Sequence, residues 1–236
     1  SICMSLLTNC IKNKDTKTNP IWLMRQAGRY LPEFREIRKK NTDFIKLCLN
    51  SDLASEITLQ PIKRFGFDGA VIFSDILMLP YGLGQKVEFE KNFGPKLGDI
   101  DLETIKNVDE ISFTEKIYKV YKAIEKTSKD PLMSNRDMIG FVGAPWTILV
   151  YMINKSSPKK GLSNDFFKDD FLINRLLGII EKFLKLHIKN QIEAGAQVIQ
   201  IFDSWAGLLE DKIPEYIYIP CLLYTSPSPR DGLLSR

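Results

Sequence analysis

Histidine and closely spaced cysteines are scarce in this chain of 236 residues, and their scarcity excludes several kinds of site. His187 is the only histidine, and the four cysteines form no C-x-x-C pair. A zinc site is therefore not expected. Disulfides are not expected either, because the chain has the composition of an intracellular protein. Any chemistry must rest on other side chains, without a histidine-rich site or a metal.

Long apolar runs and concentrated charge are also missing. No run of about 18 apolar residues occurs, so no segment is expected to span a membrane. Ser5-Leu6-Leu7 is too short an apolar core for a secretory signal. The net charge of +4 is mild and the basic residues are spread along the chain, which disfavours a nucleic-acid partner. The apolar share of 44% supports a sizeable core in one large or two small domains.

The last stretch, "CLLYTSPSPRDGLLSR" from Cys221 to Arg236, differs from the rest of the chain. Up to Pro220 there are 24 lysines and seven arginines, whereas the tail has no lysine and two arginines. A flexible tail is one interpretation. A non-native extension is the other, and we favour it because the stretch resembles translated adapter sequence. With Met4 as a natural start, we expect one domain over residues 4–220, cut short there, and a non-native tail over 221–236.

Three apolar runs end in polar residues or a turn, and helical patterns separate them. The runs suit strands buried on both faces of a parallel sheet. They are 70–73, followed by Ser74 and Asp75; 138–142, followed by Gly-Ala-Pro; and 198–202, followed by Asp203 and Ser204. We predict helices over 41–64 with Asp52 as a cap, from Pro145 onward, and over 171–194, and a surface hairpin near 86–90. Repeated strand–helix units predict an α/β fold with ligands at the carboxyl ends of the strands.

"PIWLMRQAGRYLPEF" (Pro20 to Phe34) places Arg25 and Arg29 four residues apart among apolar neighbours. On a helix they would share one face at a small cost, although Gly28 and Pro32 weaken a regular helix here. They are either two solvated surface arginines or a site for an anion. Four of the seven arginines before the tail lie between Arg25 and Arg38 in a lysine-rich chain. Because the guanidinium fork matches carboxylates, this crowding indicates a ligand with more than one carboxylate.

Four other residues are interpreted from their position alone. Asp75 is either a helix N-cap or a carboxylate that faces a cleft, since a buried acid needs a donor. Ser204 is a cap or a ligand contact. Tyr151 follows the helical period of a core residue. His187 lies at the edge of an apolar helix stripe and is interpreted as a half-buried packing residue rather than a catalyst.

Four blocks together resemble one enzyme family. They are the arginine block above, "FSDIL" (Phe73 to Leu77), "GFVGAPWTILVYM" (Gly140 to Met152) and "GAQVIQIFDSWAG" (Gly195 to Gly207). Over Pro20 to Pro220 the chain is similar to uroporphyrinogen decarboxylase, a cofactor-free carboxy-lyase of haem and porphyrin biosynthesis. The chain departs from the family pattern just after Tyr151, where Asn154 stands at a position that is usually small or acidic in the family. This single change does not weaken the resemblance.

The resemblance implies a TIM-type (β/α)8 barrel, incomplete here with N-terminal strand units only. It implies a cytoplasmic enzyme, a homodimer when full length, that decarboxylates the four acetates of the tetrapyrrole uroporphyrinogen to give coproporphyrinogen. Arg25 and Arg29 would clamp carboxylates within a binding motif that includes Gln26, Ala27 and Gly28. The same resemblance implies that Asp75 accepts hydrogen bonds from the pyrrole N–H groups and stabilises positive charge on the ring. It also implies that Tyr151 and Ser204 contact the substrate's periphery. Arg38 would be a further contact or a proton donor.

Two alternatives to this enzyme remain. One is an inactive tetrapyrrole- or anion-binding fragment, and the other is a corrinoid-related methyltransferase of the same fold, against which the Arg-Gln-Ala-Gly-Arg motif argues. The family runs well beyond Pro220. We therefore expect the fragment alone to expose an unclosed sheet edge, to fold poorly and to lack activity.

Overall fold

A parallel sheet forms the centre of the protein in this computed structural model, which describes residues 4–14, 17–208 and 233–235. Its strands lie in the order β1-β4-β5-β6, and all neighbouring pairs are parallel. The strands are β1 (Gly69–Val71), β4 (Asp137–Gly143), β5 (Val198–Phe202) and β6 (Leu233–Ser235). The predicted mixed α/β fold with a parallel sheet is confirmed. β6 belongs to the stretch interpreted as a tail, and residues 221–232 and 236 of that stretch lie outside the described residues.

All three apolar runs form strands, and β1 differs most from its predicted bounds. It ends at Val71 rather than at Phe73. The Ile72 N–H still donates to the Ile139 carbonyl of β4 at 3.0 Å. The Phe73 N–H donates to Thr58 Oγ1 of the helix α4 (Ser51–Phe65) at 2.8 Å. Because backbone groups alternate along a strand, the Phe73 N–H lies on the edge of β1 that β4 does not cover, and the bond to Thr58 satisfies it where the chain leaves the sheet before Ser74.

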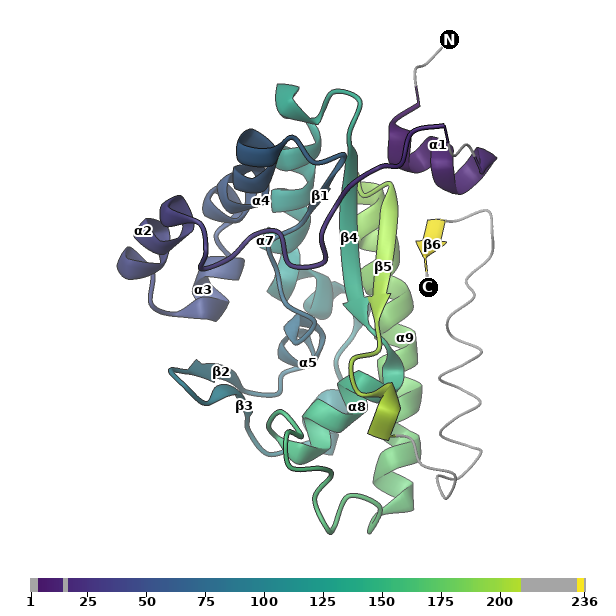
Figure 1. Ribbon diagram of the computed structural model, residues 1–236. Helices are drawn as coiled ribbons and strands as arrows, with labels where there is room; N and C mark the ends of the chain where they lie inside the picture. The colour runs from purple at the N-terminus through teal and green to yellow at the C-terminus, as the bar shows by residue number, and fades with distance from the viewer. Residues whose placement is uncertain (1–3, 15–16, 209–232, 236) are drawn as a thin grey trace.

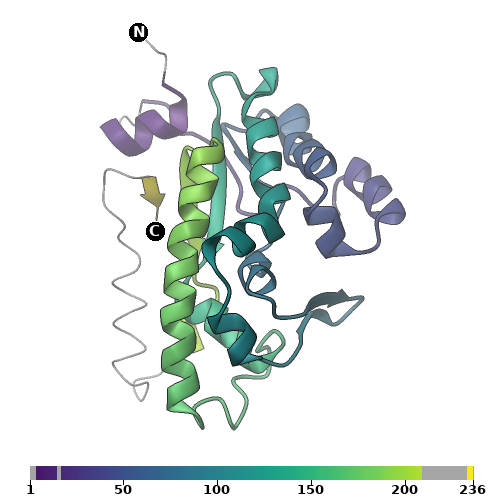
Figure 2. The same ribbon diagram turned by 180° about the vertical axis from the view of Figure 1, so that it is seen from behind.

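Helices cover one face of the sheet (Figure 1, Figure 2). α9 packs on β4 and β5, α7 packs between α9 and α4, and α4 packs on β1. The fully buried Phe113, Met138 and Ile180 belong to the core between these layers. The helices are α1 (Leu6–Asn13), α2 (Pro32–Lys40), α3 (Phe44–Cys48), α4 (Ser51–Phe65), α5 (Met78–Gly82), α6 (Leu102–Lys106), α7 (Glu110–Ser128), α8 (Pro145–Asn154) and α9 (Asp170–Ala194), with short 3₁₀ turns η1 (Pro131–Met133) and η2 (Ala206–Leu208).

The prediction of one helix over 41–64 is wrong, because the segment forms the two helices α3 and α4. The Asp43 carboxylate caps α3, and the Asn50 side chain caps α4 by accepting from the Leu53 N–H at 3.0 Å. Two separate N-caps start two separate helices. Asp52, predicted as the cap, lies in the first turn of α4. The helix does continue past Pro61 as expected.

The predicted surface hairpin is confirmed as β2 (Val87–Glu90) and β3 (Gly94–Leu97), which pair antiparallel. Its base is tied to the end of α8. The Leu97 N–H donates to the Lys155 carbonyl at 2.8 Å, and Gln85 Nε2 donates to the Met152 carbonyl at 3.1 Å. The hairpin therefore lies beside the carboxyl ends of the sheet strands rather than apart from the fold.

The sheet face opposite the helices holds a smaller apolar cluster of Leu7, Val71, Ile139 and Val198. Strand side chains alternate between faces, so these residues point away from the main core. Asp137, at 0% exposure, ties α1 to the start of β4. It accepts from the Thr8 N–H at 3.0 Å, from Thr8 Oγ1 at 2.7 Å and from Ser5 Oγ. The helix thereby covers the amino-terminal end of the sheet.

Within the described residues, we find no helix whose length and apolar character would let it cross a membrane.

Candidate active site

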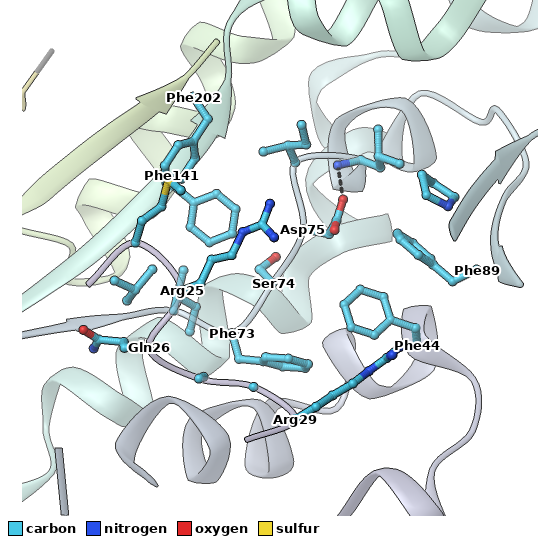
Figure 3. A pocket seen from close by; sticks show the side chains of 18 of the residues that line it. Arg25, Gln26, Arg29, Phe44, Phe73, Ser74, Asp75, Phe89, Phe141 and Phe202 are labelled. Atoms are coloured by element: carbon cyan, nitrogen blue, oxygen red, sulfur yellow. Dashed lines mark hydrogen bonds between the residues drawn. The ribbon is translucent and has the colours of Figure 1, made fainter. Parts of the chain in front are cut away.

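A pocket of about 470 Å³ lies at the carboxyl ends of β1, β4 and β5 (Figure 3). Ligands of parallel α/β folds bind at this end of the strands. Its walls come from the loop before α2, the chain that follows β1, the β2–β3 hairpin, α8 and the chain around the end of β5. Residues 24–29 and 71–77 supply its two longest lining segments.

The loop before α2 holds both paired arginines at the pocket. Residues 20–31 form no helix, and α2 begins only at Pro32, in agreement with the weak helix expected around Gly28. Arg25 and Arg29 both line the pocket, and Figure 3 shows the Arg25 side chain extending toward Asp75. No hydrogen bond or ion pair joins either guanidinium to another residue that the structure describes. Two cations that face one cavity and are unpaired among the described residues are able to bind anionic groups.

The other two arginines of the cluster are largely used by the backbone. Arg35 donates from one guanidinium nitrogen to the Arg29 carbonyl at 2.9 Å and to the Tyr30 carbonyl at 3.2 Å. Arg38 donates to the Thr42 carbonyl at 3.0 Å, and its guanidinium lies 5.6 Å from the centre of the Phe44 ring. Arg38 still lines the pocket, whereas Arg35 does not belong to the lining. The arginine cluster therefore divides into side chains that line the pocket and side chains that bind backbone carbonyls, and Arg38 does both.

Asp75 lies in the pocket wall just beyond β1, half-buried, with its carboxylate turned toward the cavity (Figure 3). Its Oδ1 accepts from the Leu77 N–H at 2.8 Å. Asp75 is not a helix N-cap, because α5 begins at Met78 after Leu77. Burial raises the pKa of Asp75 from 3.8 to about 6, and the Leu77 bond opposes this rise. A carboxylate with a raised pKa in a cleft is typical of a functional group.

Phenylalanine rings make up much of the remaining wall, and the sequence did not reveal this. The lining rings are Phe34, Phe44, Phe73, Phe89, Phe141 and Phe202. Phe44 and Phe89 lie 4.6 Å apart between centres, so α3 and the hairpin meet at the pocket. Phe89 and Pro95 reach it only through the folding of the hairpin. Phe73 and Phe202, each directly before the polar residues that follow an apolar run, are the rings whose place at a strand end could have indicated a role.

Tyr151 and Ser204 both line the pocket. Tyr151 is half-buried rather than a core residue, and burial raises its pKa above 10.0. The chain that carries Ser204 is fixed by Thr147, whose Oγ1 donates to Asp203 Oδ1 at 2.6 Å and accepts from the Trp205 N–H at 3.2 Å. Ser204 itself is exposed at the edge of the cavity.

The small residues of the arginine motif lie at the pocket, but the Gln26 side chain points away from it (Figure 3). Ala27 and Gly28 line the cavity with half-buried surfaces. Gln26 is only 1% exposed, and backbone groups occupy its amide. One further lining residue was missed: Ser74, next to Asp75, has a buried hydroxyl with no hydrogen-bond partner among the described residues.

His187 lies away from the pocket, between α9 and α7. Its Nδ1 is 2.8 Å from the Tyr121 hydroxyl, and it is 4% exposed, so it is more deeply buried than expected. Burial lowers the pKa of His187 from 6.5 to about 4. It packs in the core as predicted and does not face the cavity. In the described part of the chain, no group of three or more His, Cys, Asp and Glu side chains could hold a metal ion.

Comparison with known proteins gives a family match over nearly the whole chain. Residues 4–225 match the family model described as uroporphyrinogen decarboxylase (URO-D). A curated uroporphyrinogen decarboxylase from Rickettsia bellii is 44% identical over 221 residues, which are 92% of this chain and 64% of that protein. One from Campylobacter jejuni is 43% identical over 220 residues, 91% of this chain and 64% of that protein. The chain thus spans about 64% of the length of these curated relatives.

A solved structure shares the fold. A methyltransferase from Methanosarcina mazei superposes with a TM-score of 0.64 and 18% sequence identity. The match covers 85% of this chain and 59% of that chain. At this identity the likeness concerns the fold and carries nothing about the reaction.

Proposed function

The chain belongs to the uroporphyrinogen decarboxylase family, and we propose that the whole protein converts the four acetate side chains of uroporphyrinogen to methyls, giving coproporphyrinogen. The observation that supports this most is that one pocket holds two unpaired guanidinium groups and one carboxylate of raised pKa. Uroporphyrinogen has carboxylates at its rim and pyrrole N–H groups at its centre. Both kinds of group therefore find a partner of opposite polarity in the same cavity.

Arg25 and Arg29 bind the rim of the substrate. Each guanidinium can donate two parallel hydrogen bonds to one carboxylate, and such charge-assisted bonds are about twice as strong as neutral ones. The phenylalanine walls exclude water from these ion pairs and contact the apolar faces of the pyrrole rings. Tyr151 and Ser204 contact the substrate's periphery from the far side of the pocket.

Asp75 accepts the pyrrole N–H groups and stabilises positive charge on the ring that reacts. Protonation of this ring at carbon makes it a cation. When the bond to the carboxylate breaks, its electron pair enters the ring and carbon dioxide leaves. The exocyclic carbon then takes up a proton and the ring carbon loses one, so each acetate consumes one proton and yields one methyl. A fixed carboxylate beside the cation lowers the barrier because it needs no reorganisation.

The pocket chemistry draws on this chain's own side chains, and the ring itself serves as the electron sink. An arginine beside the departing carboxylate orients it. Arg38 is a weaker candidate for a proton donor, because its guanidinium already donates to the Thr42 carbonyl.

For the whole protein we propose a (β/α)8 barrel, of which β1, β4, β5 and their helices form the amino-terminal part. The parallel strand order and the position of the pocket at the strands' carboxyl ends support this architecture. We also propose a cytoplasmic homodimer, on family membership alone. A non-native tail over residues 221–236 stays a proposal supported by composition.

Incubation with uroporphyrinogen III, followed by mass analysis and carbon dioxide trapping, tests the activity. Because the relatives are longer, two proteins are compared: this chain, and this chain joined after Pro220 to the remaining segment of the Campylobacter jejuni relative. We expect stepwise loss of carbon dioxide from the longer protein, loss of that activity in Asp75→Ala, and no loss in the surface control Asp52→Ala. Tight binding by the longer protein without release would instead favour a tetrapyrrole-binding role. Release undiminished by Asp75→Ala would contradict the mechanism.

A further inference from the structure

The Gln26 side chain forms a bridge behind the arginine loop. Its Nε2 donates to the Gly69 carbonyl at 2.8 Å, and its Oε1 accepts from the Leu23 N–H at 3.1 Å. Its own carbonyl accepts from the Tyr30 hydroxyl. Both ends of the amide and the backbone of Gln26 are therefore engaged, and the side chain is 1% exposed.

The bond to Gly69 places Gln26 on the edge of β1 that β4 does not cover. The Asp68 carbonyl and the Ile72 N–H both face β4, where they pair with the Asp137 N–H and the Ile139 carbonyl. Because backbone groups alternate along a strand, the Gly69 carbonyl points to the opposite edge. The Gln26 amide satisfies a carbonyl there that a neighbouring strand would otherwise bind.

This bridge connects the two halves of the pocket. The loop on one side carries Arg25 and Arg29, and β1 on the other side leads into Asp75. The loop has no helix or strand of its own, so its shape depends on side-chain bonds such as this one and the Arg35 bonds at its other end. A shift of the loop along β1 would change the separation between the cations and the carboxylate.

We propose that Gln26 is a positioning residue, which holds the arginine loop in register with β1 so that Arg25 and Arg29 stand at a fixed place relative to Asp75. The proposal rests on the proposed function only in that the pocket binds a polycarboxylate. It differs from a contact role for Gln26, because the amide is bound to the backbone and turned away from the cavity. A misplacement of about 1 Å in such a site costs up to roughly a hundredfold in rate or affinity.

Two variants of Gln26 and one control test the proposal in the longer protein defined above, in which this chain is joined after Pro220 to the remaining segment of the Campylobacter jejuni relative. Gln26→Leu removes both hydrogen bonds at similar volume. Gln26→Glu keeps an acceptor for the Leu23 N–H but sets an anion against the Gly69 carbonyl. The control Thr127→Val removes a buried hydroxyl that donates to the Ala123 carbonyl at 2.7 Å and joins α7 to α4 at Ser55. Thr127 is 0% exposed and does not line the pocket, so the control reports the loss of two buried hydrogen bonds away from the pocket.

Two measurements are made on each protein. The first is hydrogen exchange of the Leu23 amide, which needs no ligand. The second is the affinity for uroporphyrin III, an oxidised and fluorescent octacarboxylate. In Gln26→Leu we expect faster exchange at Leu23 and roughly tenfold to hundredfold weaker binding. In Thr127→Val we expect neither change, even if both variants lose similar unfolding free energy.

Gln26→Glu adds a pH readout that a purely structural role would not give. Once protonated, the introduced acid can donate its O–H to the Gly69 carbonyl and still accept from Leu23. The affinity of Gln26→Glu for uroporphyrin III should therefore approach that of the wild type as the pH falls, so that the ratio of the two affinities approaches one. A ratio that stays constant with pH overturns the proposal, and so does unchanged affinity in a Gln26→Leu protein whose Leu23 exchange has risen.

The outcomes separate this proposal from the proposed function. If the wild type does not bind uroporphyrin, the polycarboxylate site is refuted and the exchange measurement alone decides the positioning role. Faster exchange at Leu23 in Gln26→Leu, absent from Thr127→Val, then supports it. Equal exchange in all three proteins overturns it. If Gln26→Leu does not fold, Gln26→Glu decides by the same two measurements.

Discussion

Replacement of Asp75 by asparagine should stabilise the folded protein at neutral pH, although it removes the proposed catalytic carboxylate. The pKa of Asp75 is raised from 3.8 to about 6 because the ionised form is poorly solvated in the pocket wall. A pKa difference of this size corresponds to about 3 kcal/mol of unfolding free energy at 1.36 kcal/mol per unit. Part of the side chain is open to the cavity, so we expect a gain of about 1 to 3 kcal/mol. Asparagine keeps an oxygen for the Leu77 N–H, so that bond is not lost.

The size of this gain in stability depends on pH between about 4 and 6. The folded pKa lies above the unfolded value, so the contribution of Asp75 to stability is fully present below about pH 4. It is lost as the pH rises toward 6, and above 6 the penalty is constant. The gain from Asp75→Asn should therefore vanish at pH 4 and reach its full size at pH 7.5.

Urea unfolding of both proteins at pH 4, 5, 6 and 7.5 measures this difference without any substrate. Asp109→Asn is the matched control. This exposed carboxylate caps α7, and hydrogen bonds from Ser112 lower its pKa, so its replacement should give no gain at pH 7.5. If Asp75→Asn is no more stable than the wild type at pH 7.5, or if its gain is larger at pH 4, Asp75 does not bear the desolvation cost that the pocket assigns to it.

Two further changes test the core and the amino-terminal helix. The pKa of His187 is lowered from 6.5 to about 4, so stability present above pH 6.5 should be lost as the pH falls toward 4. The loss should reach up to about 3 kcal/mol in urea unfolding. His187→Gln should remove that part of the pH dependence, and identical pH profiles would contradict the buried neutral imidazole. Thr8→Val should cost about 1.5 to 3 kcal/mol, because Thr8 Oγ1 donates to the buried Asp137 carboxylate at 2.7 Å, whereas Thr8→Ser should retain most of the stability. Equal stability of the two Thr8 variants would show that the bond is not needed.

Local patterns predicted the elements of the fold well where one residue type decided the outcome. The apolar runs 138–142 and 198–202 became β4 and β5, and Pro145 starts α8 at its first position. The break between α3 and α4 was missed because the expected cap, Asp52, stood near the actual one, Asn50. Both residue types cap helices, and only the hydrogen bond to Leu53 distinguishes them.

The site was predictable in its charges but not in its walls or supports. The motif and the excess of arginine led to Arg25 and Arg29, and the end of an apolar run led to Asp75; all three line the pocket. Phe89 reaches the pocket only because the hairpin is tied to α8. Gln26 was assigned to the substrate by its motif, yet its amide binds a strand that follows more than forty residues later. Such contacts depend on distant segments meeting, and no local period or spacing in one sequence encodes them.

Uroporphyrin III titration of Arg25→Gln/Arg29→Gln, followed by fluorescence, tests the central claim most directly. The matched control is Lys40→Gln/Lys46→Gln, which removes the same charge from exposed positions on α2 and α3 that do not line the pocket. Hydrogen bonds to charged groups contribute about 1.5 to 3 kcal/mol each, so the arginine variant should bind at least roughly a hundredfold more weakly. The lysine variant should change by less than about threefold, since exposed charges contribute little. Equal losses in the two variants, or no loss in the arginine variant, would contradict a pocket in which paired guanidinium groups hold the carboxylates of the ligand.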